Sequence, residues 1–489
     1  MKRVAIIGSG VAGISLSIRL AKQGYKIDVY ESNSYPGGKL TSIKSGKYSF
    51  DAGPQLFTMP HYVDELFELH NEDPRKYFNY KKKDIGCKYF WNNGLELIAY
   101  SDREKFLDEI NSKLKVDKKT LKNYLEKAKK KYDIASKIVL KKSLHKLKTY
   151  LSLDTLKAIV NFKLFEFFDT LSSVNKKQIK EPHLIQFYNR FATYIGSSPY
   201  KTSGIMTVIQ HLESYYGTFF PIGGVRSIVN ALFDLAKRKK VKFHFNSTVT
   251  EILHKNNRII GVEIDNYQRK NYEIVISNMD IFYTYKNLLP KIKTPKKVLN
   301  VSPSSSALIF YWGLNKKFKS LELHNIFFSE NYKNEFEAIF EKRNFCEDPT
   351  IYLSITSKDN PSDAPSGCEN WYVMINTHYD SGHDWDELSK KYRNVIVKKI
   401  KRILGENIEK HIVLEKILSP KMIEEKTSSY RGSLYGPASN ETFSAFKRHP
   451  NFSGKIKNMY FCGGSVHPGG GIPMCLLSSK IVSELIESK

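Results

Sequence analysis

The feature that most constrains the fold is a glycine turn placed directly after the first strand. Residues 3–7 are typical of a buried strand, and Gly8-Ser-Gly-Val-Ala-Gly13 leads at once into an apolar helical stretch that ends near Gly24. The first glycine permits the tight turn, the second lets the backbone approach a pyrophosphate, and the third lets helix and strand pack closely. A second strand, residues 26–30, ends at Glu31, near the distance at which a carboxylate accepts hydrogen bonds from an adenosine ribose. The sequence therefore predicts an α/β domain that binds a dinucleotide.

Further glycine loops occur soon after this motif and again near the carboxyl end. Tyr35-Pro-Gly-Gly-Lys39 and Ser49-Phe-Asp-Ala-Gly-Pro54 follow Glu31, and the strand-like residues 458–461 enter a glycine turn that continues to Pro473. A glycine turn before a helix presents backbone N–H groups and a positive dipole to an anion or a flavin ring. A nicotinamide enzyme is expected to continue with another crossover unit, whereas this pattern resembles the flavoproteins of the amine oxidase and phytoene desaturase group, and this resemblance implies a flavin.

Charge and cysteine content indicate which kinds of molecule and metal this chain is expected to bind. Lys and Arg number 77 against 50 acidic residues, a net charge of +27 that favours an anionic partner. The sequence has no zinc-finger spacing, RNP-like aromatic box or basic zipper, so we expect an anionic membrane surface and no nucleic acid. Five cysteines without a C-x-x-C pair argue against a disulfide framework or structural zinc, and no metal cluster is expected.

Several segments together resemble the carotenoid desaturases related to bacterial phytoene desaturase. They are 8–31, Gly37-Gly38, Phe50-Asp-Ala-Gly-Pro54, Tyr216-Gly-Thr-Phe-Phe-Pro-Ile-Gly-Gly-Val225 and His467-Pro-Gly-Gly-Gly-Ile-Pro473. Within this group, residues 51–60 and 463–473 are most similar to the 1-hydroxycarotenoid 3,4-desaturases, the methoxyneurosporene dehydrogenase type. Gln55 departs from the pattern, which has a small residue such as Ser or Thr there.

The resemblance implies an α/β fold with a discontinuous Rossmann-like FAD-binding domain. Its parts would be residues 1–75, 215–295 and 450–489; residues 76–214 would form a helical region that binds substrate and membrane, and residues 296–449 an α+β substrate domain. The strand around Val249 would pass the adenine. The implied FAD-binding residues are Gly8, Ser9, Gly10, Ala12, Gly13, Glu31, Ser32, Gly37, Gly38, Lys39, Gly53, Pro54, Val249, Gly463, Gly464, Gly471, Ile472 and Pro473.

The implied reaction removes two hydrogens from adjacent carbons of a polyene. The expected product has a new C3–C4 double bond in a 1-hydroxylated acyclic end group. His467 and Asp51 are the polar candidates beside the flavin loops. His467 would accept the proton, bond the flavin or fix the turn before Pro468, and Asp51 would act in catalysis or cap loop amides. Oxygen or a quinone would reoxidise the flavin.

One basic segment suggests where a membrane would bind. Residues 101–180 contain 21 Lys or Arg against 10 Asp or Glu in a mostly helical pattern. An apolar stripe from Leu121 to Val139 is followed by a denser apolar patch, residues 151–168, which charged residues interrupt. These stretches are either core helices with a solvated lysine face or an interfacial helix. The interfacial interpretation places a cytoplasmic protein on the inner face of the cell membrane.

Three other functions remain open from the sequence. The nearest is desaturation of phytoene itself. A flavin amine oxidase is less favoured because a +27 chain attracts cationic amines poorly. A non-enzymatic lipid escort protein, similar to the dissociation inhibitors of prenylated GTPases, would share the fold without flavin chemistry.

Overall fold

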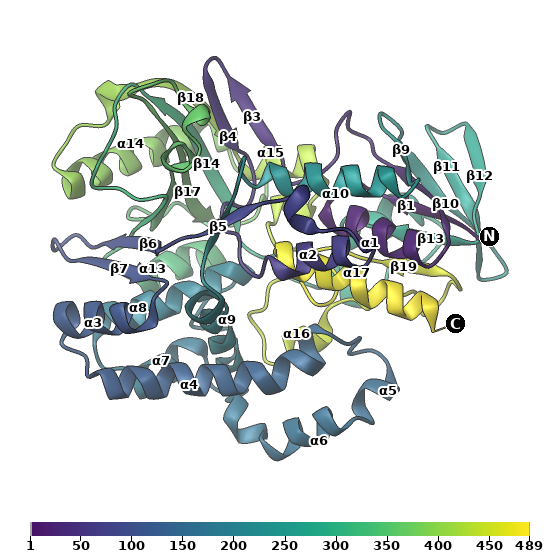
Figure 1. Ribbon diagram of the computed structural model, residues 1–489, viewed down its shortest axis with the longest axis horizontal. Helices are drawn as coiled ribbons and strands as arrows, with labels where there is room; N and C mark the ends of the chain where they lie inside the picture. Colours follow the sequence, from purple (N-terminus) through teal and green to yellow (C-terminus); the bar gives the residue numbers. More distant parts are fainter. Residues whose placement is uncertain (1, 489) are drawn as a thin grey trace.

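The computed structural model describes residues 2–488, and a parallel five-stranded sheet lies at the centre of one half of the molecule (Figure 1). Its strand order is β19-β13-β1-β2-β9, and all neighbours are parallel. The strands are β1 (Arg3–Ile7), β2 (Lys26–Tyr30), β9 (Lys242–His244), β13 (Ile274–Ser277) and β19 (Met459–Phe461). Three stretches far apart in the sequence thus meet in one sheet, and the predicted Rossmann-like α/β fold is confirmed.

Both faces of this sheet are covered, which explains its nearly continuous apolar strands. On one face lie α1 (Val11–Lys22), α2 (His61–Glu68), α10 (Arg226–Arg238) and α17 (Ile472–Glu487). On the other face packs a three-stranded antiparallel sheet of β10 (Val249–Lys255), β11 (Arg258–Ile264) and β12 (Gln268–Asn271). Ile6 of β1 faces the helices, whereas Ala5 and Ile7 face the small sheet.

A seven-stranded mixed sheet forms the other half of the molecule, in the order β18-β14-β17-β16-β15-β6-β7. Its strands are β6 (Ile85–Phe90), β7 (Glu96–Tyr100), β14 (Ser306–Leu314), β15 (His324–Phe327), β16 (Ile351–Ser354), β17 (Glu369–Thr377) and β18 (Ile412–Leu418). Its outer face packs on α14 (Trp385–Leu404) through Trp312, Val373 and Ile396. Its inner face turns towards the parallel sheet.

Two small antiparallel strand pairs connect the halves. They are β3 (Ser42–Ser45) with β4 (Tyr48–Asp51), and β5 (Tyr80–Lys82) with β8 (Phe219–Pro221). Phe50 of β4 packs edge-on against Tyr311 of β14, and the Tyr311 hydroxyl donates to the Ala52 carbonyl at 2.8 Å. These contacts fix the loop after β4 against the inner face of the large sheet.

The segment expected to be a helical region from residue 76 needs a correction at its start. Residues 80–82, 85–90 and 96–100 form β5, β6 and β7, because aromatic residues such as Tyr89 and Phe90 pack in the core of the large sheet. Helices begin only afterwards. They are α3 (Arg103–Leu114), α4 (Lys118–Ala135), α5 (Leu147–Tyr150), α6 (Leu153–Val160), α7 (Leu171–Gln178), α8 (Pro182–Asn189) and α9 (Val208–His211). The division of the chain into cofactor and substrate domains stays a prediction.

The two apolar stretches of this region behave oppositely. Leu121, Tyr124, Leu125 and Ala128 of α4 are buried, as a core helix requires. In α6, by contrast, Thr155 is the one buried residue of the described helix, and its leucines face outward. The remaining helices are α11 (Ile281–Tyr283), α12 (Lys296–Leu299), α13 (Tyr332–Glu337), α15 (Pro420–Thr427) and α16 (Ser444–Lys447).

Candidate functional site

A cavity of about 1360 Å³ lies at the carboxyl edge of the parallel sheet and extends to the inner face of the large sheet. Residues that follow four of the parallel strands line it: Gly8 after β1, Glu31 after β2, Asn278 after β13 and Gly463 near the end of β19. This edge is where open α/β sheets bind ligands. The volume exceeds the roughly 300–1000 Å³ typical of one drug-sized ligand, so the cavity has room for a cofactor and a substrate.

Close packing at the first turn explains its glycines. A methyl group on Gly13 would lie 2.3 Å from the Gly8 carbonyl oxygen, and one on Gly10 would lie 2.8 Å from the Asn278 Nδ2 atom. Helix α1 starts directly behind the turn, and among the described residues no side chain caps it and no acid occupies its first turn. The N–H groups at this end therefore remain available to an anion.

A second helix end opens on the same cavity. Helix α17 follows Gly471, whose φ of +107° favours glycine, and neither a side-chain cap nor a first-turn acid is present within residues 2–488. Helix α10 differs, because the Asp51 carboxylate accepts the Val225 N–H at 2.9 Å at its start. Two uncapped helix ends thus face a space that Gly463, Gly464 and Gly471 also line.

Glu31 is held by a set of hydrogen bonds. Its carboxylate accepts the Ser9 N–H at 2.9 Å, the Ser9 hydroxyl at 2.8 Å, and the backbone and side-chain N–H groups of Asn33 at 3.0 and 2.8 Å. Ser9 therefore lies behind Glu31 rather than on the cavity surface. The network fixes the carboxylate at the position expected for a ribose partner.

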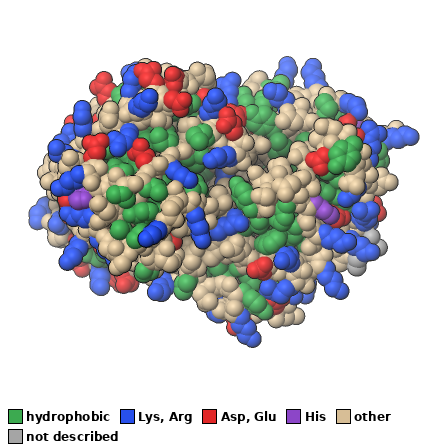
Figure 2. Space-filling model, turned by 90° about the horizontal axis from the view of Figure 1, so that it is seen from above, with side chains coloured by type: hydrophobic (Ala, Val, Ile, Leu, Met, Phe, Trp, Pro, Cys, Tyr) green, Lys and Arg blue, Asp and Glu red, His purple; other side chains and the backbone are tan. Residues whose placement is uncertain are grey.

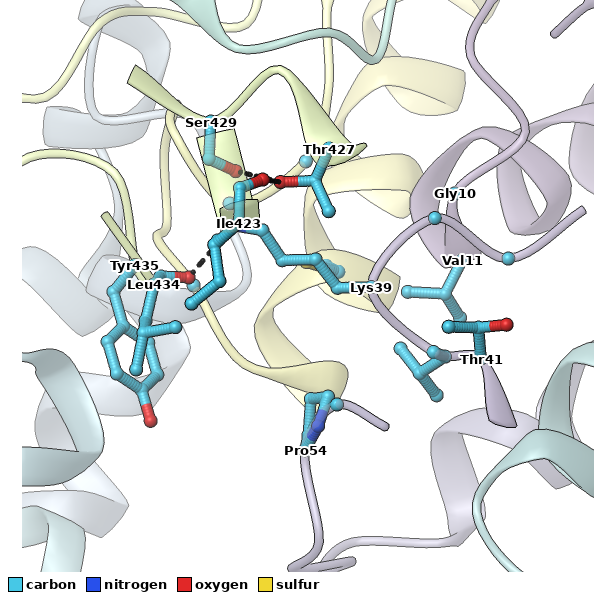
Figure 3. A pocket seen from close by; sticks show the side chains of 18 of the residues that line it. Gly10, Val11, Lys39, Thr41, Pro54, Ile423, Thr427, Ser429, Leu434 and Tyr435 are labelled. Carbon is cyan, nitrogen blue, oxygen red and sulfur yellow. Dashed lines mark hydrogen bonds between the residues drawn. The ribbon is translucent and has the colours of Figure 1, made fainter. Parts of the chain in front are cut away.

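The second glycine loop joins the two halves of the site. Its Gly37 N–H donates to the Ser9 carbonyl at 2.9 Å, and a methyl group on Gly53 would lie 1.8 Å from the Lys39 carbonyl oxygen. Lys39 then reaches across the cavity, where its ammonium donates to the Ser433 and Leu434 carbonyls at 3.2 and 3.1 Å (Figure 3). Burial lowers the pKa of Lys39, and the nearby Asp280 carboxylate opposes this shift.

Gln55, which departs from the family pattern, holds the loop after β4. Its side-chain amide donates to the Asp51 carbonyl at 2.7 Å and to the Gly53 carbonyl at 3.1 Å, and the residue lines the cavity. A serine or threonine has one hydroxyl hydrogen and cannot make both bonds. Gln55 therefore holds this loop through two hydrogen bonds that a serine or threonine could not both make.

The structure brings nearly all of the expected cofactor residues to this cavity. Those that line it are Gly8, Gly10, Ala12, Glu31, Ser32, Gly37, Gly38, Lys39, Gly53, Pro54, Val249, Gly463, Gly464, Gly471, Ile472 and Pro473. Ser9 and Gly13 are the exceptions, since the first supports Glu31 and the second packs on Gly8.

Asp51 lies behind the cavity wall, between β4 and the start of α10. Besides accepting the Val225 N–H, its carboxylate packs on Gly224, where a methyl group would lie 2.6 Å from Oδ2. Burial raises the pKa of Asp51 to about 7, and the hydrogen bond from Val225 opposes the shift. This geometry is that of a carboxylate that caps loop amides.

His467 is also placed away from the cavity surface. It is fully buried, and its Nε2 atom lies 3.0 Å from the Lys142 carbonyl oxygen. Burial lowers the pKa of His467 to about 4, so the ring is neutral. Neither His467 nor Asp51 is among the described residues that line the cavity. A catalytic function for either stays a prediction that this placement does not support.

An apolar row crosses the inner face of the large sheet, with one residue from each of five adjacent strands. The strand register aligns Leu418, Ile309, Met374, Tyr352 and Ile326, and all five line the cavity. At about 4.8 Å per strand, four intervals span about 19 Å. The large sheet thus packs on α14 with one face and lines an elongated apolar space with the other.

Some lining residues escaped the sequence analysis. Asn278 follows β13, and the rule that parallel strands end at one edge would have found it. Arg226 follows the Gly223-Gly224 pair and donates to the Pro36 and Leu40 carbonyls at 2.5 and 3.2 Å. The segment 423–436, seen beside Lys39 in Figure 3, carries no motif that indicates a binding function.

Comparison with known proteins gives the class. The family model for flavin containing amine oxidoreductases matches residues 11–486, so the chain belongs to this family. The cofactor is FAD, a dinucleotide with the anionic pyrophosphate that the uncapped ends of α1 and α17 suit.

Individual relatives have more specific names than the family model. The chain is 51% identical over 486 residues to a 1-hydroxycarotenoid 3,4-desaturase from Flavobacterium sp. (strain P99-3), covering 99% of each chain. It is 30% identical to a 4,4'-diaponeurosporene oxygenase from Staphylococcus aureus (strain MSSA476), over 100% of this chain and 98% of that one. The predicted resemblance to carotenoid desaturases is confirmed. A solved cyclohexylamine oxidase from Brevibacterium oxydans shares the fold, with a TM-score of 0.61, 15% identity and coverage of 100% and 99%.

Replacing Gly13 with alanine should separate α1 from the first turn, because the added methyl group has no space beside the Gly8 carbonyl oxygen. We expect FAD affinity to fall by at least about tenfold. The measurement is the flavin-to-protein ratio after purification. Gly454→Ala is the matched control, since a methyl group there meets open space. Equal flavin content in the two variants would contradict the assigned geometry.

Asp51 should make stability depend on pH. Its folded pKa of about 7 lies above the unfolded value of about 4, so the folded state binds more protons and stability falls as pH rises between them. Asp51→Asn keeps an acceptor for Val225 and removes the charge. Its melting temperature relative to wild type should therefore rise between about pH 4 and pH 7. Asp234→Asn, at an exposed position on α10, serves as control, and a pH-independent difference for Asp51→Asn would contradict the prediction.

Proposed function

We propose that this protein is an FAD-dependent carotenoid desaturase that forms the C3–C4 double bond in a 1-hydroxylated acyclic end group. The observation that carries the proposal is a single cavity that joins the glycine loops to an apolar row about 19 Å long. Identity of 51% over 99% of both chains with a relative of that name supports the substrate and the bond.

The reaction breaks the C3–H and C4–H bonds and forms the C=C bond. FAD, when bound, would supply a two-electron oxidant, so that one hydrogen is lost as a hydride equivalent and the other as a proton. The chain's residues exclude water and hold the polyene. Positive charge that develops beside a polyene is delocalised, which reduces the need for a strong base. The placement of Asp51 and His467 outside the cavity surface agrees with this.

The glycine loops are the proposed FAD-binding elements. The ends of α1 and α17 would hold the anionic pyrophosphate and the flavin, Glu31 the ribose, and the backbone around Val249 the adenine. The cofactor domain would consist of residues 1–75, 215–295 and 450–489, with substrate elements in 76–214 and 296–449.

Expression in bacterial hosts tests the activity. One host accumulates phytoene and the other a 1-hydroxylated acyclic carotenoid, and extracted pigments are compared by chromatography and absorption spectra. We expect a red shift in the hydroxylated host alone, because each added conjugated double bond moves absorption to longer wavelength. New pigment in the phytoene host would move the assignment to the earlier step. If the pigments change in neither host although the protein has FAD bound, both substrate assignments are contradicted.

We also propose that residues 147–168 dock on a membrane surface. Leu151, Leu153 and Val160 are 86%, 77% and 84% exposed, the reverse of a core helix. Exposed lysines accompany them at Lys146, Lys148, Lys157 and Lys163. Apolar groups at acyl chains and lysines at anionic headgroups are the pattern of an interfacial helix. In Figure 1, α5 and α6 form the lower edge of the molecule, away from both sheets.

Basic side chains are not confined to this patch. On the face in Figure 2, Lys and Arg side chains lie over the whole view, between groups of hydrophobic side chains and acidic ones (Figure 2). Within residues 2–488, none of the helices is long and apolar enough to cross a bilayer. We therefore propose peripheral attachment to the inner face of the cell membrane, where a quinone or oxygen accepts the electrons.

Vesicle binding tests the patch. Replacing Leu151, Leu153 and Val160 together with serine should weaken binding to vesicles that contain anionic lipid by about tenfold or more, since each buried apolar side chain contributes about 1 kcal/mol or more. The measurement is cosedimentation with phosphatidylcholine vesicles with and without phosphatidylglycerol. The control replaces Tyr267 and Val413, which are exposed elsewhere, with serine. Equal binding of both variants would show that the patch does not dock.

A further inference from the structure

A buried polar cluster borders the otherwise apolar part of the cavity. The Arg190 guanidinium donates to the Tyr89 hydroxyl at 2.7 Å and to the Tyr194 hydroxyl at 3.4 Å, and lies 3.7 Å from the Glu213 carboxylate. The Tyr194 hydroxyl donates to the same carboxylate. Arg190, Tyr194 and Glu213 line the cavity, and Arg190 is 7% exposed.

His324 of β15 extends the cluster from the large sheet. Its Nδ1 atom lies 2.9 Å from the Tyr352 hydroxyl, and both residues line the cavity. Burial, and then the charges of Lys83 and Arg190, lower the pKa of His324 to about 3, so the ring is neutral. A neutral imidazole has one nitrogen that donates and one that accepts.

The cluster has unused hydrogen-bonding capacity. Arg190 Nε and His324 Nε2 are buried and have no partner among the described residues. A second buried ion pair in the molecule is different: Lys131 bonds Glu166, the Thr207 hydroxyl at 2.8 Å and the Gly204 carbonyl at 3.4 Å, which uses all its donors. Lys131 and Glu166 lie outside the cavity lining as described. Arg19, which pairs with Glu65, also has a buried Nε atom without a partner among the described residues, but both residues lie outside the cavity lining. The Arg190–Glu213 pair is therefore distinguished by its position beside the ligand space.

Stability alone does not account for such a cluster. Removing a guanidinium and a carboxylate from water costs free energy that their attraction often fails to recover, and apolar residues of similar volume are often at least as stable. The Arg190 guanidinium makes cation–π contacts with the rings of Tyr89, Phe191 and Tyr194, which fix its position. A fixed set of donors and acceptors beside an apolar cavity is how binding sites select a polar group on an apolar ligand.

We propose that Arg190, Tyr194, Glu213 and His324 bind the hydroxyl group of the substrate end group. The inference rests on the proposed function, in which the substrate carries one hydroxyl on an otherwise hydrocarbon chain. A hydroxyl both donates and accepts, and the cluster offers partners of both kinds. An end group without the hydroxyl would bury these groups unpaired, so the cluster discriminates against it.

The same contact sets the position of the polyene. The hydroxyl sits on C1, two bonds from C3, so holding the oxygen fixes the C3–C4 bond along the cavity. The cluster residues are thus specificity and positioning residues, and proton transfer is not assigned to them.

The test compares Tyr194→Phe with Tyr188→Phe in the FAD-loaded protein. Tyr188 is a suitable control because its ring stacks on Phe191, its buried hydroxyl has no partner in the described chain, and it does not line the cavity. kcat/KM is measured for a 1-hydroxylated acyclic carotenoid and for the same carotenoid without the hydroxyl, both supplied in liposomes. Tyr194→Phe should lower the value about tenfold for the hydroxylated substrate and leave the other unchanged. Tyr188→Phe should change neither.

A double variant, Arg190→Met with Glu213→Leu, removes both charges together and should abolish the preference for the hydroxylated substrate while FAD content is kept. An equal loss on both substrates, or no loss in either Tyr194→Phe or the double variant, would overturn the proposal. Dissociation constants of the two carotenoids, read from the absorbance change on binding, separate this from failure of the proposed function. If wild type converts neither substrate, a hydroxyl-dependent affinity that Tyr194→Phe loses still supports the cluster, and its absence refutes it.

Discussion

The close packing of the Gly8–Gly13 turn against α1 is the constraint on which the rest of the site depends. With 2.3 Å between a Gly13 methyl group and the Gly8 carbonyl oxygen, only glycine allows helix and strand to meet there. That contact brings the uncapped end of α1 to the carboxyl edge of the parallel sheet. Gly37 bonds the Ser9 carbonyl of the same turn, and Gly53 packs on Lys39 in the loop that Gly37 begins, so these loops lie together around the anion-binding space.

The large sheet supplies what the cofactor loops lack. Its inner face contributes an apolar row and His324, and Arg190 and Glu213 reach the same cavity from two helical segments. An apolar cavity with few polar groups can bind a long hydrocarbon and recognise one oxygen on it by hydrogen bonding. The position of Asp51 and His467 behind the wall means that selectivity comes from the shape and polarity of the cavity, while FAD carries the redox chemistry.

The dinucleotide half was predictable because its signals are local in sequence. A strand, a glycine turn, a helix and Glu31 occur within 31 residues, and each glycine has a steric reason that the structure shows. The substrate half was not, since Arg190 and Glu213 come from separate helical segments and His324 from β15, and only the tertiary fold brings them to one cavity. The sequence pattern also could not show whether the apolar stretch near Leu156 is buried or exposed. A core helix and an interfacial helix need the same apolar residues, and only tertiary packing distinguishes them.

A single-turnover experiment without oxygen tests the central claim most directly. The FAD-loaded protein is mixed with excess 1-hydroxylated carotenoid, and the extracted pigments are weighed by mass spectrometry. The account predicts about one product molecule per bound FAD, lighter than the substrate by two hydrogens, because the flavin accepts one hydride equivalent. No product, or a product that has gained oxygen, would contradict the account.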